Sequence, residues 1–456
     1  MSLRDFIEQA RQAGCLVEIH REVNPHLELA RVAAALDGKP VLFHHVTAPH
    51  PTPPPWHTTG EGTTRVLVGA GSAREYYALG LGVGVGQLMG KLADALEHPR
   101  PPDVVESGAC QQVVESDADL GRLPILTHLP TDHAPYITAG VAIIHDPDYG
   151  RNVSFHRLMV TGPRTVVARI VEGRGTDTAW RKASDGLPVA ICVGNSLPVL
   201  LAASMSPPKG VDELGIANAM QPTPLVQCKT IDLQVPAESE FVLEGHITHQ
   251  LADEGPFLDL TETMDFVRQQ PVIEIDCITH RRDAIYQALL PGKLEHKLLM
   301  GMPKEPTIFA AVSQACECRD VVITPGGTSW LHAVVSIVKR DAEDGRRALE
   351  AAFAGHGSLK HVVVVDDDIN IHAPAQVEWA IATRFQADRD LVVLADQPGS
   401  SLDPSATHVP GQKTRTAKMG LDATIPWGAN RKEYEKMEYE KIEARAYLNT
   451  GPSLDQ

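Results

Sequence analysis

The sequence predicts a multidomain α+β protein, with an α/β domain at each end and an antiparallel β-barrel or sandwich between them. Helices and strands alternate at the start of the chain, short strands separated by turns begin near Gln111, and the alternation returns after Gly292. At 456 residues the chain is also too long for one ordinary hydrophobic core. We therefore expect domains at 1–105, 106–300 and 301–456.

In the first domain, Ser2 is placed to cap a helix over 2–14, whose apolar residues share one face. The Pro- and Thr-rich stretch 50–62 is predicted to be an exposed loop. The glycines of 80–84 resemble a phosphate loop but do not form the dinucleotide fingerprint, so a simple turn is favoured. The other expected elements are strands at 15–19, 41–43 and 66–69, helices at 27–36 and 85–96, and a stiff linker at 98–102.

The middle of the chain is predicted to hold mostly strands, with one short helix at 198–205. The expected strands are 140–145, 152–160, 165–170, 189–193, 225–235, 241–247 and 272–280.

The last domain is predicted to be a βαβ series and therefore a parallel or mixed sheet. Its helices are expected at 304–315, 342–354 and 375–385, and its strands at 321–323, 332–339, 361–365 and 391–394. The charged segment 430–446 is predicted to be a helix. It either packs on a partner subunit or presents a solvated face.

Composition limits the function. With 58 acidic against 41 basic residues, the formal net charge of −17 argues against binding to nucleic acid. No basic and apolar leader opens the sequence and no long apolar run crosses it, so we expect a cytoplasmic protein with no membrane segment. Seven scattered cysteines fit free thiols, and the pair Cys316 and Cys318 lacks the further ligands of a zinc site.

The strand predicted at 152–160 carries the first candidate site. Asn152, Ser154 and His156 alternate with Val153, Phe155 and Arg157, so an amide, a hydroxyl and an imidazole share one face. These groups can ligate a hard cation directly or through a phosphate. The arginine on the other face needs a carboxylate partner if it is buried. An ordinary amphipathic strand is the alternative.

Two acids downstream form the second candidate site. Glu254 and Asp259 flank Gly255-Pro256, and Phe257 offers an apolar cover. Two carboxylates near one arginine can differ in pKa and so provide a proton donor near neutral pH. A surface acidic turn is the alternative.

Together these segments resemble the UbiD family of decarboxylases, which use prenylated flavin mononucleotide. The Asn-x-Ser-x-x-Arg strand resembles the cofactor-binding strand of that family, and further segments follow in the family's order over nearly the whole chain. They are 212–214, 228–230, 231–237, 241–245, 254–259 and 418–424.

The resemblance implies a small α/β domain, a split β-barrel that binds the flavin, and a closing α/β domain. It implies reversible, non-oxidative decarboxylation of an aromatic, heteroaromatic or α,β-unsaturated carboxylic acid, with release of CO₂. The cofactors implied are prenylated FMN and Mn²⁺ or Mg²⁺, with K⁺ as a further candidate. Arg157 is expected to orient the substrate carboxylate, Glu254 to fix the arginine, and Asp259 to return a proton.

The resemblance also assigns cofactor contacts. Asn152 and Glu213 are the expected metal ligands, although Glu213 also fits a plain helix-start acid. Arg169 is expected to bind phosphate through its planar guanidinium, and Lys418 to act as a phosphate counter-ion, with solvated surface charge as the alternative. The full set of expected contacts is Ser154, Phe155, His156, Arg157, Arg169, Ile170, Val171, Arg174, Gly175 and Lys418.

The sequence departs from the family at one metal ligand. Many members have a histidine just after the following strand, but 168–175 contains none. Phosphate and water complete the coordination, or else Glu172 or His156 substitutes.

Other readings stay open. The chain fits at least a homodimer supplied with cofactor by a flavin prenyltransferase. A non-catalytic flavin carrier and a metal-dependent hydrolase built on Asp366-Asp367-Asp368 are the alternative functions, although that acidic run is favoured as a cap on the next helix. His296 and His332 are expected to be core residues.

Overall fold

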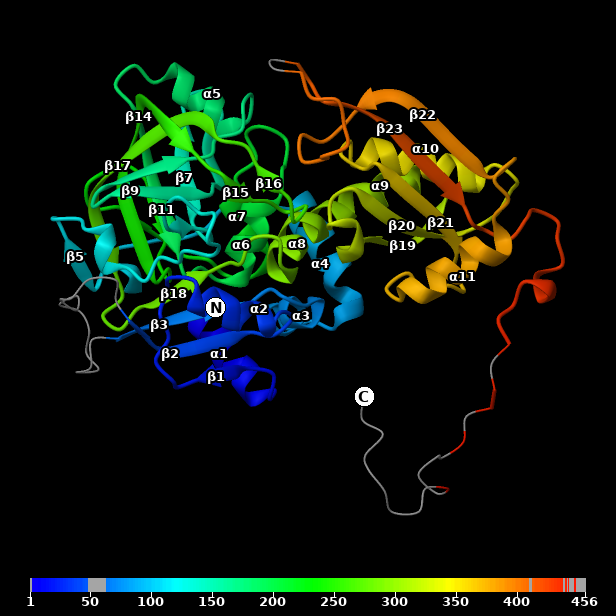
Figure 1. Cartoon of the computed structure of the whole chain (residues 1–456), viewed down its shortest axis with the longest axis horizontal. Coiled ribbons are helices and arrows are strands. Elements are labelled where there is room, and N and C mark those ends of the chain that lie inside the picture. Colours follow the sequence, from blue (N-terminus) through cyan, green and yellow to red (C-terminus); the bar gives the residue numbers. More distant parts are fainter. Residues whose placement is uncertain are drawn as a thin grey trace.

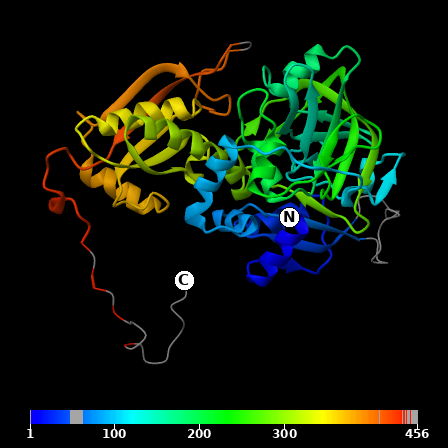
Figure 2. The same ribbon diagram turned by 180° about the vertical axis from the view of Figure 1, so that it is seen from behind.

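The computed structural model describes residues 2–47, 63–409, 412–437, 439–440, 442 and 447. The described chain forms two lobes. One contains the N-terminal sheet and the barrel, and the other is built on the C-terminal sheet (Figure 1). Seen from behind, the helical segment in light blue that contains α4 lies between the two lobes (Figure 2). The predicted loop at 50–62 lies outside the described residues.

The N-terminal lobe begins as predicted. Ser2 caps α1 in a reciprocal arrangement with Asp5, and the apolar face predicted for this helix is buried through Leu3, Phe6, Ile7 and Ala10. The elements are α1 Leu3–Gln12, β1 Val17–Ile19, α2 Glu28–Ala35, β2 Val41–Thr47, β3 Thr63–Val68, α3 Arg74–Leu81, η1 Val85–Gln87 and α4 Leu88–Glu97.

The first sheet takes its last strand from far along the chain. Its order is β1-β2-β3-β18, and β18 (Ile285–Ala288) runs parallel to β3. Phe43 of β2, Val66 of β3 and Phe241 of the barrel belong to one buried apolar cluster. The N-terminal sheet and the barrel therefore share a core.

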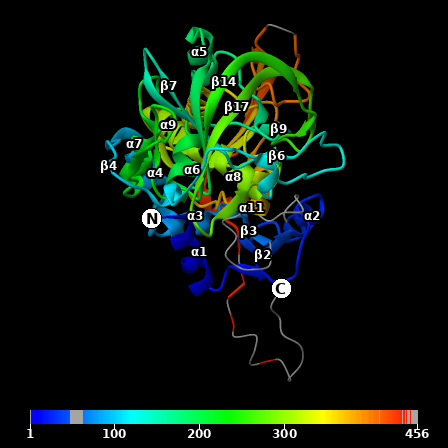
Figure 3. The same ribbon diagram turned by 90° about the vertical axis from the view of Figure 1, so that its left-hand side faces the viewer.

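The central barrel is a nine-stranded sheet among the described residues, in the order β6-β9-β10-β17-β14-β11-β7-β8, with β5 also pairing with β17. The long strands β14 and β17 arch over the other strands when the barrel faces the viewer (Figure 3). The strands are β5 Val113–Glu115, β6 Tyr136–Ile137, β7 Val141–Asp146, β8 Gly150–Phe155, β9 Leu158–Gly162, β10 Thr165–Ala168, β11 Leu187–Val193, β14 Phe241–Glu254 and β17 Arg268–His280.

The strand predicted over 152–160 is wrong in one respect that matters for the site. It is two strands, β8 and β9, and they lie near opposite ends of the sheet order. His156 and Arg157 connect them and so cross the seam where the barrel is split. Arg157 consequently leaves the alternation of the strand and is free to point toward the end of β14.

The rest of the middle domain surrounds the barrel. The strand predicted at 225–235 is instead a hairpin of β12 and β13, which pairs with β4 in a separate small sheet. These elements are β4 Val104–Val105, η2 Ala109–Gln111, η3 Leu120–Arg122, α5 Gly175–Lys182, α6 Leu197–Ser204, α7 Glu213–Met220, β12 Leu225–Gln227, β13 Gln234–Pro236, β15 Phe257–Leu258 and β16 Met264–Asp265.

The C-terminal lobe is a mixed sheet in the order β19-β20-β21-β23-β22, so the predicted βαβ pattern is confirmed. Strand β23 lies between β21 and β22 and contains Lys418-Met419-Gly420. It was not predicted as a strand. The elements are α8 Leu294–Gly301, η4 Met302–Lys304, α9 Glu305–Ala315, β19 Glu317–Ile323, η5 Pro325–Gly327, β20 His332–Val338, α10 Asp344–Gly355, β21 His361–Asp366, α11 Pro374–Arg384, β22 Leu391–Pro398 and β23 Arg415–Asp422.

The helix predicted over 430–446 is wrong for the part of the tail that the structure describes. Among the described residues of 430–446, the only helical segment is the short turn η6, Arg431–Glu433. The charged residues have too little apolar spacing to give a helix a face that packs. Among the described helices, none combines the length and the hydropathy that crossing a bilayer requires.

Candidate active site

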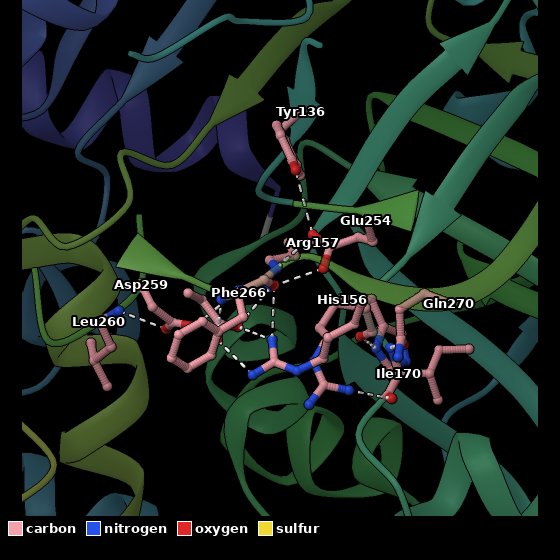
Figure 4. A network of polar contacts seen from close by, with 12 residues as sticks. Tyr136, His156, Arg157, Ile170, Glu254, Asp259, Leu260, Phe266 and Gln270 are labelled. Atoms are coloured by element: carbon pink, nitrogen blue, oxygen red, sulfur yellow. Dashed lines mark hydrogen bonds and ion pairs between the residues drawn. The ribbon is translucent and has the colours of Figure 1, made fainter. Parts of the chain in front are cut away.

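The link between β8 and β9 places Arg157 among three carboxylates (Figure 4). Its Nε and Nη2 donate to the two oxygens of Glu254, each at 2.8 Å. Nη1 donates to Asp259 Oδ2 at 2.9 Å, and Nη2 also donates to Asp265 Oδ2 at 2.8 Å. The structure thus brings together the three residues predicted to be catalytic and adds a fourth, Asp265.

Each acid stands at the end of a strand. Glu254 is the last residue of β14, Asp259 directly follows β15, and Asp265 ends β16. The β15–β16 hairpin pairs Phe257 with Asp265, and the backbone N–H of Asp259 donates to Thr263. The sequence analysis identified Glu254 and Asp259 but missed Asp265. Its position on the hairpin next to Asp259 is the signal that could have identified it.

An aromatic pair covers the ion cluster from one side. The guanidinium of Arg157 lies 4.8 Å from the ring centroid of Phe257, which in turn lies 4.7 Å from the ring of Tyr136. The Tyr136 hydroxyl donates to Glu254 Oε1 at 3.5 Å. Burial and the charge of Glu254 raise the pKa of Tyr136, so this hydroxyl stays protonated. Nothing in the sequence pattern pointed to Tyr136.

The cluster has more acids than bases. Arg268 donates to both oxygens of Asp265, so two guanidinium groups face three carboxylates. Burial opposes ionisation of Asp265, but its bond to Arg268 and the charges of both arginines lower its pKa to about 2. If every group is ionised, one negative charge is in excess. An enclosed cluster with this excess favours the uptake of one proton.

The hydrogen bonds of Arg157 leave one donor over. A guanidinium has five N–H bonds, and the four bonds to carboxylates occupy Nε, both positions of Nη2 and one of Nη1. Within the described chain, the second N–H of Nη1 has no hydrogen-bond partner. Burial disfavours the charge of Arg157, but the bonds and charges of Glu254, Asp259 and Asp265 raise its pKa, so it stays cationic.

His296 of α8 also faces this cluster. The sequence suggested a core residue, but His296 is only partly buried, and its Nδ1 accepts from Gly292 N at 3.1 Å. Burial lowers the pKa of His296, with the charge of Asp259 opposing the shift and that of Arg157 adding to it. It is therefore a neutral imidazole close to both groups.

The two predicted metal ligands lie beside each other. Asn152 Nδ2 donates to Glu213 Oε1 at 3.3 Å, and Val153 N donates to Oε2 at 3.0 Å. Glu213 begins α7, as the alternative reading had it, yet its side chain is buried rather than solvated. Burial raises its pKa to about 7, against the hydrogen bonds that favour the anion. Among the described residues it has no cationic partner, so a divalent cation fits its chemistry.

The start of α5 adds a place for phosphate at the same point. Arg174 is the N-cap and makes no capping bond with its side chain, and Gly175 is the first helical residue. A Cβ at Gly175 would lie 2.8 Å from Asn152 Oδ1, so only glycine leaves this approach open. Backbone N–H groups at a helix start, next to a buried acid and amide, suit a phosphate bound with its cation.

A third protein ligand is not in position in the described structure. There, no three His, Cys, Asp or Glu side chains gather as a metal site. Glu172 is 63% exposed and turned toward Arg169. His156 Nε2 faces the hydroxyls of Ser154 and Thr176 at 3.2 and 3.1 Å, and Nδ1 lies 3.0 Å from the backbone oxygen of Arg169. Of the alternatives left open, phosphate and water fit best.

The remaining expected cofactor contacts divide into two groups. Phe155 ends β8, while Ile170 and Val171 follow β10, where Ile170 N donates to Gln270 Oε1 at 2.7 Å. Arg169 Nη1 donates to the oxygen of Ile170 at 2.7 Å. Lys418 makes no contact with the other expected cofactor contacts among the described residues. Its Nζ donates to Gly357 O at 2.7 Å, and its described contacts stay inside the C-terminal lobe.

The acidic run after β21 has a structural partner. Asp366 and Asp368 bind the buried Arg384 instead of capping a helix, because the N-cap of α11 is Ala373. His332 was expected in the core but is only partly buried: Nδ1 lies 2.7 Å from Thr324 Oγ1, and desolvation lowers its pKa to about 4.

Three family models match consecutive parts of the chain. They describe the N-terminal, Rift-related and C-terminal domains of 3-octaprenyl-4-hydroxybenzoate carboxy-lyase, and they match residues 7–96, 103–294 and 297–423.

Relatives and solved structures agree with these models. Anhydromevalonate phosphate decarboxylase of Methanosarcina mazei is 41% identical over 93% of this chain and 96% of its own length. The enzyme of that name from Methanothermobacter thermautotrophicus is 42% identical over 93% and 97%. The UbiD-class enzyme HmfF from Pelotomaculum thermopropionicum, solved with FMN, gives a TM-score of 0.89 at 37% identity, with 98% and 99% of the chains covered. The 3,4-dihydroxybenzoic acid decarboxylase of Enterobacter cloacae gives 0.87 at 26% identity, with 98% of each chain covered.

Proposed function

The chain belongs to the UbiD family of carboxy-lyases and is a decarboxylase, and we propose that it acts on a phosphorylated α,β-unsaturated carboxylic acid with prenylated FMN and a divalent cation. Anhydromevalonate phosphate is the named candidate. Among the acid classes expected from the sequence, the unsaturated aliphatic class fits, because loss of water from a 3-hydroxy acid gives a 2-enoate.

One observation carries the reaction type: a single guanidinium held by three carboxylates, with one N–H to spare. That N–H of Arg157 Nη1 can bind one oxygen of the substrate carboxylate. Glu254 holds the guanidinium plane through two bonds and so fixes the direction of the spare donor.

Asp259 is the best candidate for the proton donor. Asp265 accepts four hydrogen bonds, from Arg157, from two Arg268 nitrogens and from Phe266 N. Asp259 accepts two, from Arg157 Nη1 and Leu260 N. The less firmly held acid can carry the extra proton of the cluster and return it to the substrate carbon after CO₂ departs.

The residues that would hold the cofactor lie on β8 and at the starts of α5 and α7. The chemistry that prenylated FMN supplies when bound is an electron sink for the electron pair left by CO₂, which no protein side chain offers. Asn152 and Glu213 would hold the cation, and the first N–H groups of α5 the phosphate.

The alternative functions lose their support. A metal-dependent hydrolase needs Asp366 and Asp368 as ligands, but Arg384 occupies both. A carrier needs no arginine–carboxylate cluster. An assembly of at least two copies remains part of the proposal, and it rests on the family, because the predicted tail helix that supported it is absent from the described residues.

The test is decarboxylation by protein co-expressed with a flavin prenyltransferase. We expect CO₂ release from anhydromevalonate phosphate, read by mass spectrometry of the product, and no release from 3,4-dihydroxybenzoate. The matched control is protein made without the prenyltransferase, which should carry FMN and be inactive. Turnover of the aromatic acid alone would overturn the substrate assignment.

A further inference from the structure

Lys304 is a cation without a counter-ion at the junction of the two lobes. It ends η4 directly before α9, where α8 and α4 lie between the barrel and the C-terminal sheet (Figure 1). In the described chain its ammonium has no hydrogen-bond or ion-pair partner. Burial, with the nearby charge of Arg174 adding to the effect, lowers the pKa of Lys304 to about 8. An anion placed here would remove both penalties.

The side chain of His356, which has an unsatisfied nitrogen, lies near Lys304. The backbone oxygen of Lys304 and that of Gly355 both accept from Thr307 Oγ1, at 2.8 and 3.0 Å, which brings His356 beside the start of α9. The ring of His356 is buried, and its Nε2 has no partner among the described residues. Its pKa is lowered to about 4 by burial and by the charge of Lys304, so it is neutral.

The loop after η5 completes the cluster. Trp330 packs edge-on against His356 at 4.5 Å, and the preceding Ser329 lies against Gly301, where a Cβ would meet its backbone oxygen at 2.5 Å. Ser329 Oγ and Thr328 Oγ1 are both buried and unpartnered in the described structure. Both residues have positive φ, of 64° and 51° for Thr328 and Ser329, which side chains rarely adopt. Such strain recurs where a loop is shaped around a ligand.

Lys304 is connected to the Arg157 cluster through α8 and η4. α8 carries His296, which faces Asp259 and Arg157, and runs directly into Lys304. Eight residues of helix span about 12 Å, and the long side chain of lysine shortens the gap. α8 and η4 thus join the two places that the carboxylate and the phosphate of one substrate molecule would occupy.

From these contacts we infer that Lys304, with Arg174, His356, Thr328 and Ser329, binds the distal phosphate of the substrate. The inference rests on the proposed function, because it names the subsite for the phosphorylated end of that acid. The same chemistry would also bind the phosphate of the flavin, so the test separates the two sources.

Lysine footprinting tests the site without turnover. The flavin-loaded protein is acetylated with trace acetic anhydride at pH 8 and Lys304 is compared by peptide mass spectrometry with the exposed Lys209. Pentyl phosphate at ten times its dissociation constant should slow acetylation of Lys304 roughly tenfold. Pentanol should not, and Lys209 should react equally in all samples. Unchanged acetylation of Lys304 with pentyl phosphate would overturn the inference.

A second arm identifies the source of the phosphate. If FMN added to flavin-free protein protects Lys304 and pentyl phosphate adds nothing, the cofactor is the occupant and the substrate assignment is wrong. If pentyl phosphate protects Lys304 but the enzyme does not decarboxylate anhydromevalonate phosphate, the subsite stands and the named substrate fails.

Kinetics of a variant complete the test. Lys304→Met should lower kcat/KM for the phosphorylated acid about 10–10²-fold more than for its dephosphorylated analogue, the loss of one charged hydrogen bond. Its flavin content should match that of Lys209→Met, the control. Equal losses on both acids would contradict a role at the phosphate.

Discussion

Two buried arginines in this protein have the same surroundings and different uses. Arg157 and Arg384 each hold carboxylates, and each lies under an aromatic ring, Phe257 at 4.8 Å and Trp379 at 5.2 Å. In both places three acids face two arginines. The difference lies in where the excess charge and the spare donor are.

At Arg384 the excess charge is in water. The guanidinium is 0% exposed and donates to Asp366, Asp368 and the backbone oxygen of Tyr434, while Asp367 and its neighbour Arg431 are exposed. Its unsatisfied Nε is sealed inside the protein. Nothing can reach this donor, so the cluster fixes one geometry between α11 and the loop after β21.

At Arg157 the excess charge is enclosed. Glu254 is fully buried and the other two acids are mostly buried, while the Arg157 side chain keeps 10% exposure. An enclosed excess carboxylate can exchange a proton, and a partly exposed donor can bind a ligand. We conclude that accessibility, rather than the ion-pair pattern, separates the reactive cluster from the structural one.

The largest effect should come from the proton. Asp259→Asn keeps the size and hydrogen bonding of the side chain but cannot donate a proton, so kcat should fall about 10²–10⁴-fold. Flavin content and substrate binding should be retained. Asp265→Asn is the matched control. Its kcat per folded molecule should fall less, because Asp265 is held by Arg268 and is not the proposed proton donor. A larger loss in Asp265→Asn would reverse the assignment.

Arg157→Lys should have the next largest effect on activity. Lysine keeps the charge but loses the planar fork that binds Glu254 and directs the spare N–H. Losing one well-placed donor costs about 10²–10³-fold in kcat/KM. Thermal unfolding should change much less than activity does. If kcat stayed near normal and only KM rose, Arg157 would contribute to substrate binding and not to the chemical step.

Arg384→Met should show the opposite separation. Removing the partner of buried acids costs about 3–5 kcal/mol, so the unfolding midpoint in urea should drop clearly. The activity of the molecules that remain folded should be unchanged. A selective loss of activity without a loss of stability would break the distinction drawn between the two clusters.

The sequence predicted the parts of the site that follow from local pattern. Asn152, Arg157, Glu254 and Asp259 were found because their motifs are short and ordered along the chain. The break at His156 was missed because alternation continues through it, and only the split of the barrel makes the two halves separate strands. Residues such as Tyr136 reach the site through folding alone, and no local spacing marks them.

The fold shows the same limit. Elements with strong apolar periodicity or caps, such as α1, were predicted closely. The return of β18 to the first sheet is a long-range pairing that leaves no local signal. The segment 430–446 was predicted as a charged helix, but its described residues form only the short turn η6, because a helix without an apolar face gains little from packing.

The smallest expected effect compares two buried carboxylates, of which we expect only one to bind a cation. Burial raises the pKa of both Glu213 and Glu295 to about 7, yet Glu295 accepts from Gly69 N and Gly71 N, while Glu213 lies beside Asn152. In metal-free protein each carboxyl stays protonated up to about pH 7 when the protein is folded, but ionises near pH 4.5 when it is unfolded. Their stabilisation is therefore complete below pH 4.5 and is lost as pH rises to about 7, by roughly 3 kcal/mol for each group. Either Glu→Gln variant should flatten this fall in stability in a series of thermal unfolding measurements at different pH.

Mn²⁺ binds the ionised form, so it should stabilise the wild type and Glu295→Gln more at pH 8 than at pH 5.5, and should leave Glu213→Gln unaffected. An equal response to Mn²⁺ in Glu213→Gln would remove Glu213 from the cation site.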